Sequence, residues 1–367
     1  MTTNTRTPQH LVLAAIVSAA AMITAAWWWL SPDRNHFADP ANALLRLWLD
    51  AGQTALVMFA IGLLGTVLAS AGLRFPSARH RLAAPSALLG LGAGGLLGLG
   101  AIATTGYLVA LAMPLILGFV IVQLIRRGGL ARWLAIAAPL AVVGVLIATG
   151  VLTAEALPVI AEVFRLVGDQ AGIIASEYLL VALLAAWAVT ALKGAGRGVR
   201  QWVLRHRRTI TVLAALGPLP YAVLRLSWLT PWPVLSPTND IPPQMRLWGL
   251  MLSVGAWAGI VLTIGLIRPW GETFPRWLPR VAGREVPVWF AAVPGGLVAT
   301  VVCAAALPML ARASGSWLTW LEVVFILPFW FWGPMLGLAV WGYVLHRAEP
   351  STVGATAEAR RSPAPLR

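Results

Sequence analysis

Long uncharged apolar segments, separated by short polar ones, dominate this chain. Residues 11–30 and 85–125 contain no charged side chain. A helix needs about 20 apolar residues to cross the hydrocarbon of a bilayer. The segment 85–125 is too long for one such helix, and we expect two helices that turn near Thr104, Thr105 and Gly106.

This pattern predicts an all-α polytopic transmembrane helix bundle of about ten spans. The expected spans are 11–30, 52–72, 85–104, 107–125, 133–153, 172–192, 210–229, 246–267, 287–310 and 318–345. Residues 1–346 would form a single transmembrane domain. The segment 347–367 is rich in Ala, Pro, Ser and Arg, and we expect a disordered basic tail on the cytoplasmic side.

The charged residues orient the bundle. Lys and Arg total 27 against 13 Asp and Glu, which gives a formal net charge of +14. Most of the basic residues fall in segments that ten spans place on one side, such as 74–81, 126–132, 193–208 and 268–284. Cytoplasmic loops carry such an excess, so both termini are expected inside, in a plasma membrane. This placement favours anionic lipid headgroups as partners and argues against nucleic acid.

Tryptophans mark the expected membrane interfaces. Trp27, Trp28 and Trp29 extend the first apolar segment beyond the length of a signal peptide core, which indicates a retained anchor. Trp270 and Trp277 lie in the Pro- and Arg-rich segment 268–287, where we expect an aromatic and basic anchor at the cytoplasmic face.

Glycines at a spacing of four predict close packing between helices. Gly90, Gly92 and Gly95 match a dinucleotide-binding pattern, but they lie inside a membrane segment without a preceding strand. The small-residue pattern of membrane helices fits better, with a flexible hinge as the alternative. The glycines assigned to this packing are Gly90, Gly94, Gly98, Gly255, Gly259, Gly333 and Gly337.

Motifs for catalysis and metal binding are absent from the sequence. The five histidines fall in loops or at expected helix ends, without the spacing of a zinc site. Cys303 is the only cysteine and lies in an apolar segment. We therefore predict no catalytic residue, no metal site and no cofactor. Enzymes of the membrane interior can disperse their reactive residues, so an enzyme remains the third choice.

Charged and tyrosine side chains inside the expected spans are the strongest functional signal. Such residues are costly in lipid and often mark a substrate site, an ion path or a buried pair. They are Glu177, Tyr178, Tyr221, Arg225 and Glu322. Counted along their helices, the three charged residues share a depth near the outer face. Our hypothesis is an outward-facing vestibule in which Arg225 pairs with Glu177 or Glu322. The alternative is that each side chain reaches the outer headgroups independently.

The outer segment 153–171 has apolar residues at helical spacing between charged ones. This pattern predicts an amphipathic helix at the outer surface. It is either a connector that rests on lipid or a lid over the vestibule.

The second half of the chain resembles multi-pass membrane proteins of high-GC actinobacteria that have no established activity. Three motifs carry the resemblance: R-P-W-G at 268–271, P-R-W-L-P at 275–279 and G-R-x-V-P at 283–287. A Pro-Tyr-x-x-x-Arg helix at Pro220, Tyr221 and Arg225 precedes them. The resemblance covers about residues 213–346 and implies a membrane bundle but no activity.

These observations favour a small-molecule transporter or permease with an outward-facing polar vestibule. The alternative is a structural or regulatory membrane protein that acts through its loops. A cavity reaching Arg225 from outside favours the first class, and a tightly packed bundle with an ordered loop surface favours the second.

Overall fold

The computed structural model describes residues 8–148, 168–230, 241–276, 281–313 and 316–349, together with positions 150, 152, 165, 232–234 and 278. Within these residues the fold is all-α, as predicted. Their only β interaction is an antiparallel bridge between Thr273 and Glu285.

Seven helices or helix runs in the described residues are long and apolar enough to cross a membrane. The continuous ones are α1 (Gln9–Leu30), α2 (Ala51–Arg74), α7 (Ala171–Lys193), α11 (Pro243–Gly265) and α12 (Val288–Arg312). One run consists of α9 (Arg207–Leu216), α10 (Leu219–Arg225) and η6 (Leu226–Leu229). The other consists of α13 (Trp317–Leu321), the π-helix η9 (Glu322–Ile326) and α14 (Phe329–Ala348). Seven of the expected spans match these elements, which indicates a multi-pass membrane protein.

The apolar segment 85–125 differs from the prediction. It contains α3 (Ala83–Gly95) and α4 (Gly100–Arg127), and the predicted turn at Thr104, Thr105 and Gly106 is wrong because these residues lie inside α4. The break falls at 96–99, and the axes of Ala83–Gly95 and Gly100–Val109 differ by 84°. This bent pair provides at most an eighth candidate span.

A tertiary contact explains the position of this break. The segment 32–47, which consists of short 3-10 turns, folds back against the end of α3. The backbone N–H of Leu44 donates to the carbonyl of Leu97 at 3.1 Å. A Cβ at Gly95 would lie 3.3 Å from Cγ of Leu45. The returning loop therefore occupies the space into which α3 would otherwise continue.

The remaining elements lie at the membrane-facing edge and at one end of the bundle. Helix α5 (Gly129–Ala148) follows α4 and contains the expected span 133–153 only as far as residue 148. The short helices η5 (Pro76–Arg81), α8 (Arg197–Arg205) and η7 (Pro269–Gly271) connect the longer ones. The expected helix at 153–171 falls mostly outside the described residues. In its described part, Arg165 pairs with Asp169 at 3.1 Å.

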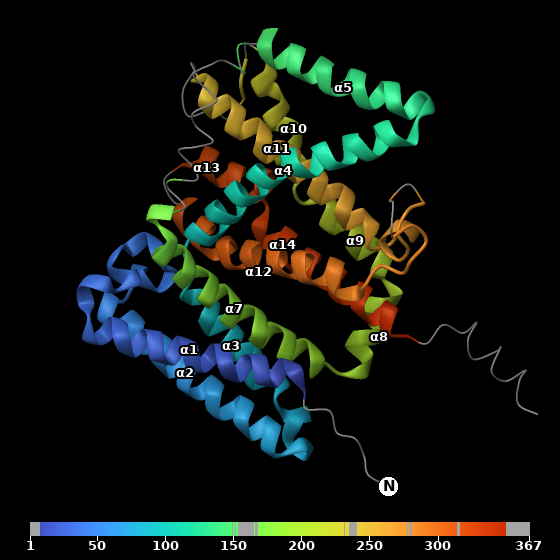
Figure 1. Cartoon of the computed structure of the whole chain (residues 1–367). Helices are drawn as coiled ribbons and strands as arrows, with labels where there is room; N and C mark the ends of the chain where they lie inside the picture. Colours follow the sequence, from blue (N-terminus) through green and yellow to red (C-terminus); the bar gives the residue numbers. More distant parts are fainter. Residues whose placement is uncertain are drawn as a thin grey trace, which may run out of the picture.

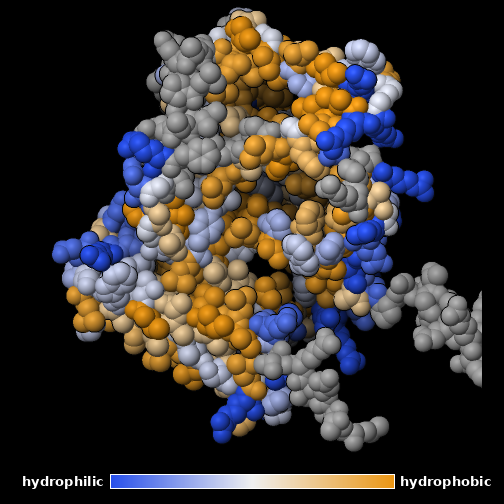
Figure 2. Space-filling view, in the orientation of Figure 1, coloured by the Kyte–Doolittle hydropathy of each residue, from blue (hydrophilic) through white to orange (hydrophobic). Residues whose placement is uncertain are grey.

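The long helices run side by side across the molecule (Figure 1). Helix α1 packs on α2, α3 packs on α7, and α12 packs on α14. Helix α5 and the second half of α4 form the upper edge in this view. Figure 2 shows hydrophilic residues mainly toward the two sides where helices end, with apolar residues between them. This distribution is expected of a bundle whose middle lies in lipid.

The glycines that were predicted to pack helices together have different surroundings in the structure. Gly333 and Gly337 face α12, and a Cβ at Gly333 would lie 2.8 Å from the backbone N of Cys303. Gly90 faces α7, whereas Gly94 has open space around it. The prediction is wrong for Gly98, which lies in the break after α3 instead of on its face.

Gly255 and Gly259, a predicted packing pair, also differ from each other, and close packing occurs at two glycines that were not predicted. A Cβ at Gly255 would lie 2.9 Å from Cγ1 of Val109, whereas Gly259 has no neighbour within 4 Å. In α2, Gly62 and Gly65 lie tightly against α1, since an added Cβ would meet Met22 at Gly62 and Ser18 at Gly65. These two glycines are three residues apart, whereas the predicted packing glycines are four apart.

The predicted aromatic anchors have different environments. Trp28 is buried and stacks on His36, with 5.6 Å between ring centroids, whereas Trp27 and Trp29 are exposed. Trp270 packs its ring against Gly265 and is 38% exposed. Trp277 lies outside the described residues.

Candidate functional site

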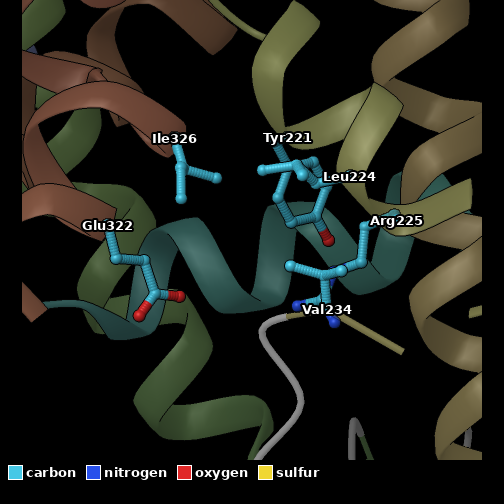
Figure 3. Close-up of a pocket in the computed structure, with 6 residues that line it drawn as sticks. All are labelled: Tyr221, Leu224, Arg225, Val234, Glu322 and Ile326. Atoms are coloured by element: carbon cyan, nitrogen blue, oxygen red, sulfur yellow. The ribbon is translucent and has the colours of Figure 1, made fainter. Parts of the chain in front are cut away.

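A pocket joins three of the five predicted site residues. Tyr221 and Arg225 come from α10, and Glu322 comes from the first residue of η9 (Figure 3). The remaining lining residues are Leu224, Val234 and Ile326. The cavity between these side chains is about 10 Å³, room for about one water molecule, and it is partly open to solvent. The predicted convergence of helices 210–229 and 318–345 therefore has a structural counterpart.

Arg225 is held by aromatic rings. Its guanidinium carbon lies 3.9 Å from the centroid of the Trp228 ring and 5.0 Å from that of Tyr221. Trp228 follows Arg225 by three residues, which puts both on one helix face. Such cation–π contacts position the guanidinium but leave its N–H groups free to donate. The Nη1 atom is buried and has no hydrogen-bond partner among the residues that the structure describes.

Glu322 occupies an irregular point of its helix run. The residues Glu322–Ile326 form a π-helix, and the N–H of Leu327 donates to the carbonyl of Glu322 at 2.9 Å. Pro328 follows and has no N–H to continue the helical bonds. Single π-helical turns are frequent at functional sites.

The structure contains neither of the expected ion pairs. Arg225 and Glu322 line the same pocket without approaching within 4.0 Å, and no ion pair joins Arg225 to Glu177. The two groups stay apart because the Arg225 guanidinium lies on the Trp228 ring. Glu322 belongs to a different helix run, where it is the first residue of η9. A cationic and an anionic group therefore face one pocket and remain available to another molecule.

Glu177 and Tyr178 form a second site on α7. Glu177 is 3% exposed, and its carboxylate lies against the Cα of Gly100, the first residue of α4. The hydroxyl of Tyr178 lies 2.9 Å from Oγ1 of Thr105 on α4. The common depth predicted for Glu177 and Arg225 did not bring them together, because α7 packs on α3 while α10 packs on α11.

Sequence reasoning missed Val234 as a lining residue of the pocket and Trp228 as the ring that holds Arg225. The Trp228 indole N–H donates to the carbonyl of Val234 at 3.0 Å, and its ring approaches Gly249 of α11. The three-residue spacing from Arg225 to Trp228 was a signal in the sequence that could have identified the ring. Val234 comes from the connection to α11, and nothing local in the sequence indicates it.

A cluster of charges at the other end of the bundle was also missed. The Glu272 carboxylate lies 3.4 Å from Nε2 of His346 and 4.0 Å from Nη1 of Arg207. Arg347 donates to the carbonyls of Glu272 and Val286, at 3.2 and 3.0 Å. We call these five residues the loop cluster. It fixes the segment 268–287 to the end of α14.

Among the described residues, no three His, Cys, Asp or Glu side chains are grouped to hold a metal ion. The chemistry available at the pocket is recognition: a guanidinium offers donors, a carboxylate offers acceptors, and aromatic rings fix the guanidinium.

Comparisons with known proteins give no assignment. No family model, no curated protein and no solved structure matches this chain. The case for its function therefore depends on its own residues: a multi-pass helical membrane protein in which Arg225 and Glu322 face one pocket.

Proposed function

We propose that this protein is a transporter or permease for a small polar solute, and that the pocket at Arg225 binds the solute from the outer side. The carrying observation is the buried, unpartnered Nη1 of Arg225 in a pocket that Glu322 also lines. A buried donor without a partner costs about 1–3 kcal/mol, which a ligand oxygen would recover.

The two charges define the solute class. Arg225 would bind a carboxylate or another anionic group, and Glu322 would bind an ammonium group on the same molecule. A small zwitterion satisfies both side chains and brings no net charge into the pocket. A solute with only one charge would leave either Arg225 or Glu322 without an opposite charge, which is costly near a membrane interior.

The expected path of ten spans, with both termini cytoplasmic, belongs to this proposal. Contacts at one end of the bundle support it. A Cβ at Gly72 would meet the side chains of Leu11 and Leu82, and one at Gly194 would meet Ala83. The loop cluster brings Arg207, Glu272 and His346 together in the same way. All these residues lie in segments expected in the cytoplasm or at the cytoplasmic ends of expected spans, where Arg and Lys concentrate.

Movement is required for transport, and the walls of the pocket are suited to it. Both helix runs that line it are interrupted: α9 is followed by α10 and η6, and α13 by a π-helix before α14. Interrupted helices are frequent where transporters bind substrates. We propose that the pocket enlarges by movement of α10 and η9.

Anionic lipid headgroups are the proposed partners on the cytoplasmic side of a plasma membrane. Helix α8 supports this, because Arg197, Arg200 and Arg205 are exposed beside the exposed Trp202, while Val203 is buried. A short helix with this division lies well at a headgroup interface. Membership in the actinobacterial group that segment 213–346 resembles likewise remains a proposal.

A second function has one observation in its favour. The loop cluster orders the segment 268–287, and a structural or regulatory membrane protein that acts through its loops needs such an ordered surface. That function requires no solute at Arg225, so the same experiment separates the two.

The test measures thermal stabilisation of the full chain in lipid nanodiscs by a panel of α-amino acids. Each amino acid is compared with its decarboxylated amine and its N-acetylated derivative. We expect stabilisation by zwitterions only, with affinity at least about tenfold lower in Arg225→Gln and in Glu322→Gln, because each substitution removes about 1.4 kcal/mol or more of binding free energy.

The matched control is Arg34→Gln, which changes an exposed arginine stacked on Trp27 and should leave binding unchanged. Absence of stabilisation by every zwitterion, or equal loss in Arg34→Gln, would contradict the proposed site and favour the loop function.

A further inference from the structure

Glu177 is a buried acidic group without a partner among the described residues. It is 3% exposed and lies in the second turn of α7, against the start of α4. No hydrogen bond or ion pair joins its carboxylate to any described residue. An ionised carboxylate in such surroundings is costly, and membrane proteins use isolated acids of this kind to carry protons.

The break between α3 and α4 lies directly against this group. Gly100 is the first residue of α4, and a Cβ added to it would overlap the Oε1 atom of Glu177. The carboxyl therefore lies at a helix start, and it has this room only because residue 100 is glycine. The adjacent pair of Tyr178 and Thr105 fastens the first turns of α4 to α7.

Among the described side chains, the neighbouring helices bring no cation to Glu177. Helix α3 contains no titratable side chain, α1 contains only His10 at its far end, and the described side chains of α12 contribute Cys303, which faces Gly333 of α14. On α4, Tyr107 stacks on Trp248, and the arginines lie at the opposite end of that helix.

The loop that covers the break has charges, but they are engaged elsewhere. Asp39 accepts a hydrogen bond from the N–H of Ala41 at 2.8 Å. Arg46 donates to the carbonyl of Phe37 at 2.8 Å and also to that of Leu49. Among the described side chains, none is therefore free to neutralise Glu177. The first N–H groups of α4 carry only a partial positive charge and none of them donates to the carboxylate, so a proton is the remaining full counter-charge.

We propose that Glu177 is a proton-binding site controlled by the α3–α4 break. The carboxyl keeps its proton on an oxygen while Gly100 is packed against it. When the start of α4 moves away and water enters, the O–H bond breaks and the proton passes to water, leaving a solvated carboxylate. The site itself is independent of the Arg225 pocket. Only its role as the coupling site of transport rests on the proposed function.

Infrared spectroscopy of the solute-free full chain in lipid tests the proposal directly. At pH 7 the wild type should show the C=O stretch of a protonated carboxyl group, and Glu177→Gln should lose it. Glu322→Gln is the matched control and should retain that band. Gln has the shape of a protonated Glu, so Glu177→Gln should fold normally, which thermal unfolding verifies.

If the difference spectrum of wild type and Glu177→Gln shows only carboxylate bands, Glu177 is ionised and the proposal is overturned.

A second variant tests whether the α3–α4 break controls the proton. Gly100→Ala displaces the carboxyl, so the band should disappear at a lower pH than in wild type. An unchanged titration in folded Gly100→Ala would also contradict the proposal. Because no solute is present, failure here leaves the zwitterion test unaffected.

Discussion

The packed layer of α1, α2, α3 and α7 differs sharply from the edge formed by the second half of α4 and by α5. In the layer, Ala14, Met58, Leu180 and Trp187 are fully buried or nearly so. At the edge, apolar side chains point outward, among them Leu115, Trp133, Leu140 and Ile147. The layer is therefore held by protein contacts, whereas the edge depends on lipid.

This difference indicates which parts can move. Helices that bury large side chains against one another resist displacement, because separation opens cavities. Helices whose apolar faces meet lipid exchange one apolar contact for another when they shift. Helix α4 belongs to both regions, since its start packs on Glu177 and its second half lies at the edge. In addition to the proposed movement of α10 and η9, we therefore expect α4 to move.

Tryptophan truncation should give the largest contrast between the two regions. Trp187 is fully buried and donates to Oγ of Ser18 at 3.0 Å, so Trp187→Ala should cost about 3–5 kcal/mol of unfolding free energy. The matched variant Trp133→Ala, at a side chain 67% exposed on α5, should cost less than about 1 kcal/mol. Thermal and denaturant unfolding in the same lipid measure both. Equal losses would remove the distinction between layer and edge.

Acid should weaken the layer through His36. Burial lowers the pKa of His36 to about 4, against an opposing effect of Asp39, and both ring nitrogens lack partners. The folded state favours the neutral His36 ring. The free energy of unfolding is therefore unaffected by this ring above pH 6.5 and decreases as the pH falls toward 4. The loss should approach about 3 kcal/mol.

Unfolding free energies of wild type and His36→Phe between pH 7 and 4.5 measure this effect. The variant should show a smaller decline, because it lacks the titrating ring. Parallel declines in the two proteins would assign the acid sensitivity to other groups.

Replacing a glycine by alanine should change the free energy of unfolding by a smaller amount, with a loss in the layer and a gain at the edge. A Cβ at Gly62 would lie 2.7 Å from the backbone N of Met22, so Gly62→Ala should cost about 1–3 kcal/mol. Gly144 in α5 has no neighbour within 4 Å, and Gly144→Ala should stabilise by about 0.5–1 kcal/mol through helix propensity. Stabilisation by Gly62→Ala would show that α1 and α2 are less tightly packed than described.

Hydropathy alone predicted most of the helices, because an uncharged run of membrane length has few other stable conformations in lipid. It failed at 96–99, where the break depends on the contact between Leu44 and Leu97, which are distant in sequence. Counting along helices gave Glu177, Arg225 and Glu322 one depth, and the structure places only Arg225 and Glu322 at one pocket. It did not separate Glu177, because depth says nothing about which helices are neighbours. The loop cluster likewise depends on a tertiary contact between 272 and 346–347.

We propose a serpentine path that brings the Arg225 pocket to the outer face, and cysteine labelling measures this path. Single cysteines at Asp33, Thr230, Gly196 and Val281, in a Cys303→Ala background, are exposed to a membrane-impermeant thiol reagent in intact cells. We expect labelling at 33 and 230, and labelling at 196 and 281 only after permeabilisation. Labelling of 196 or 281 in intact cells would contradict the path and the outward-facing pocket with it.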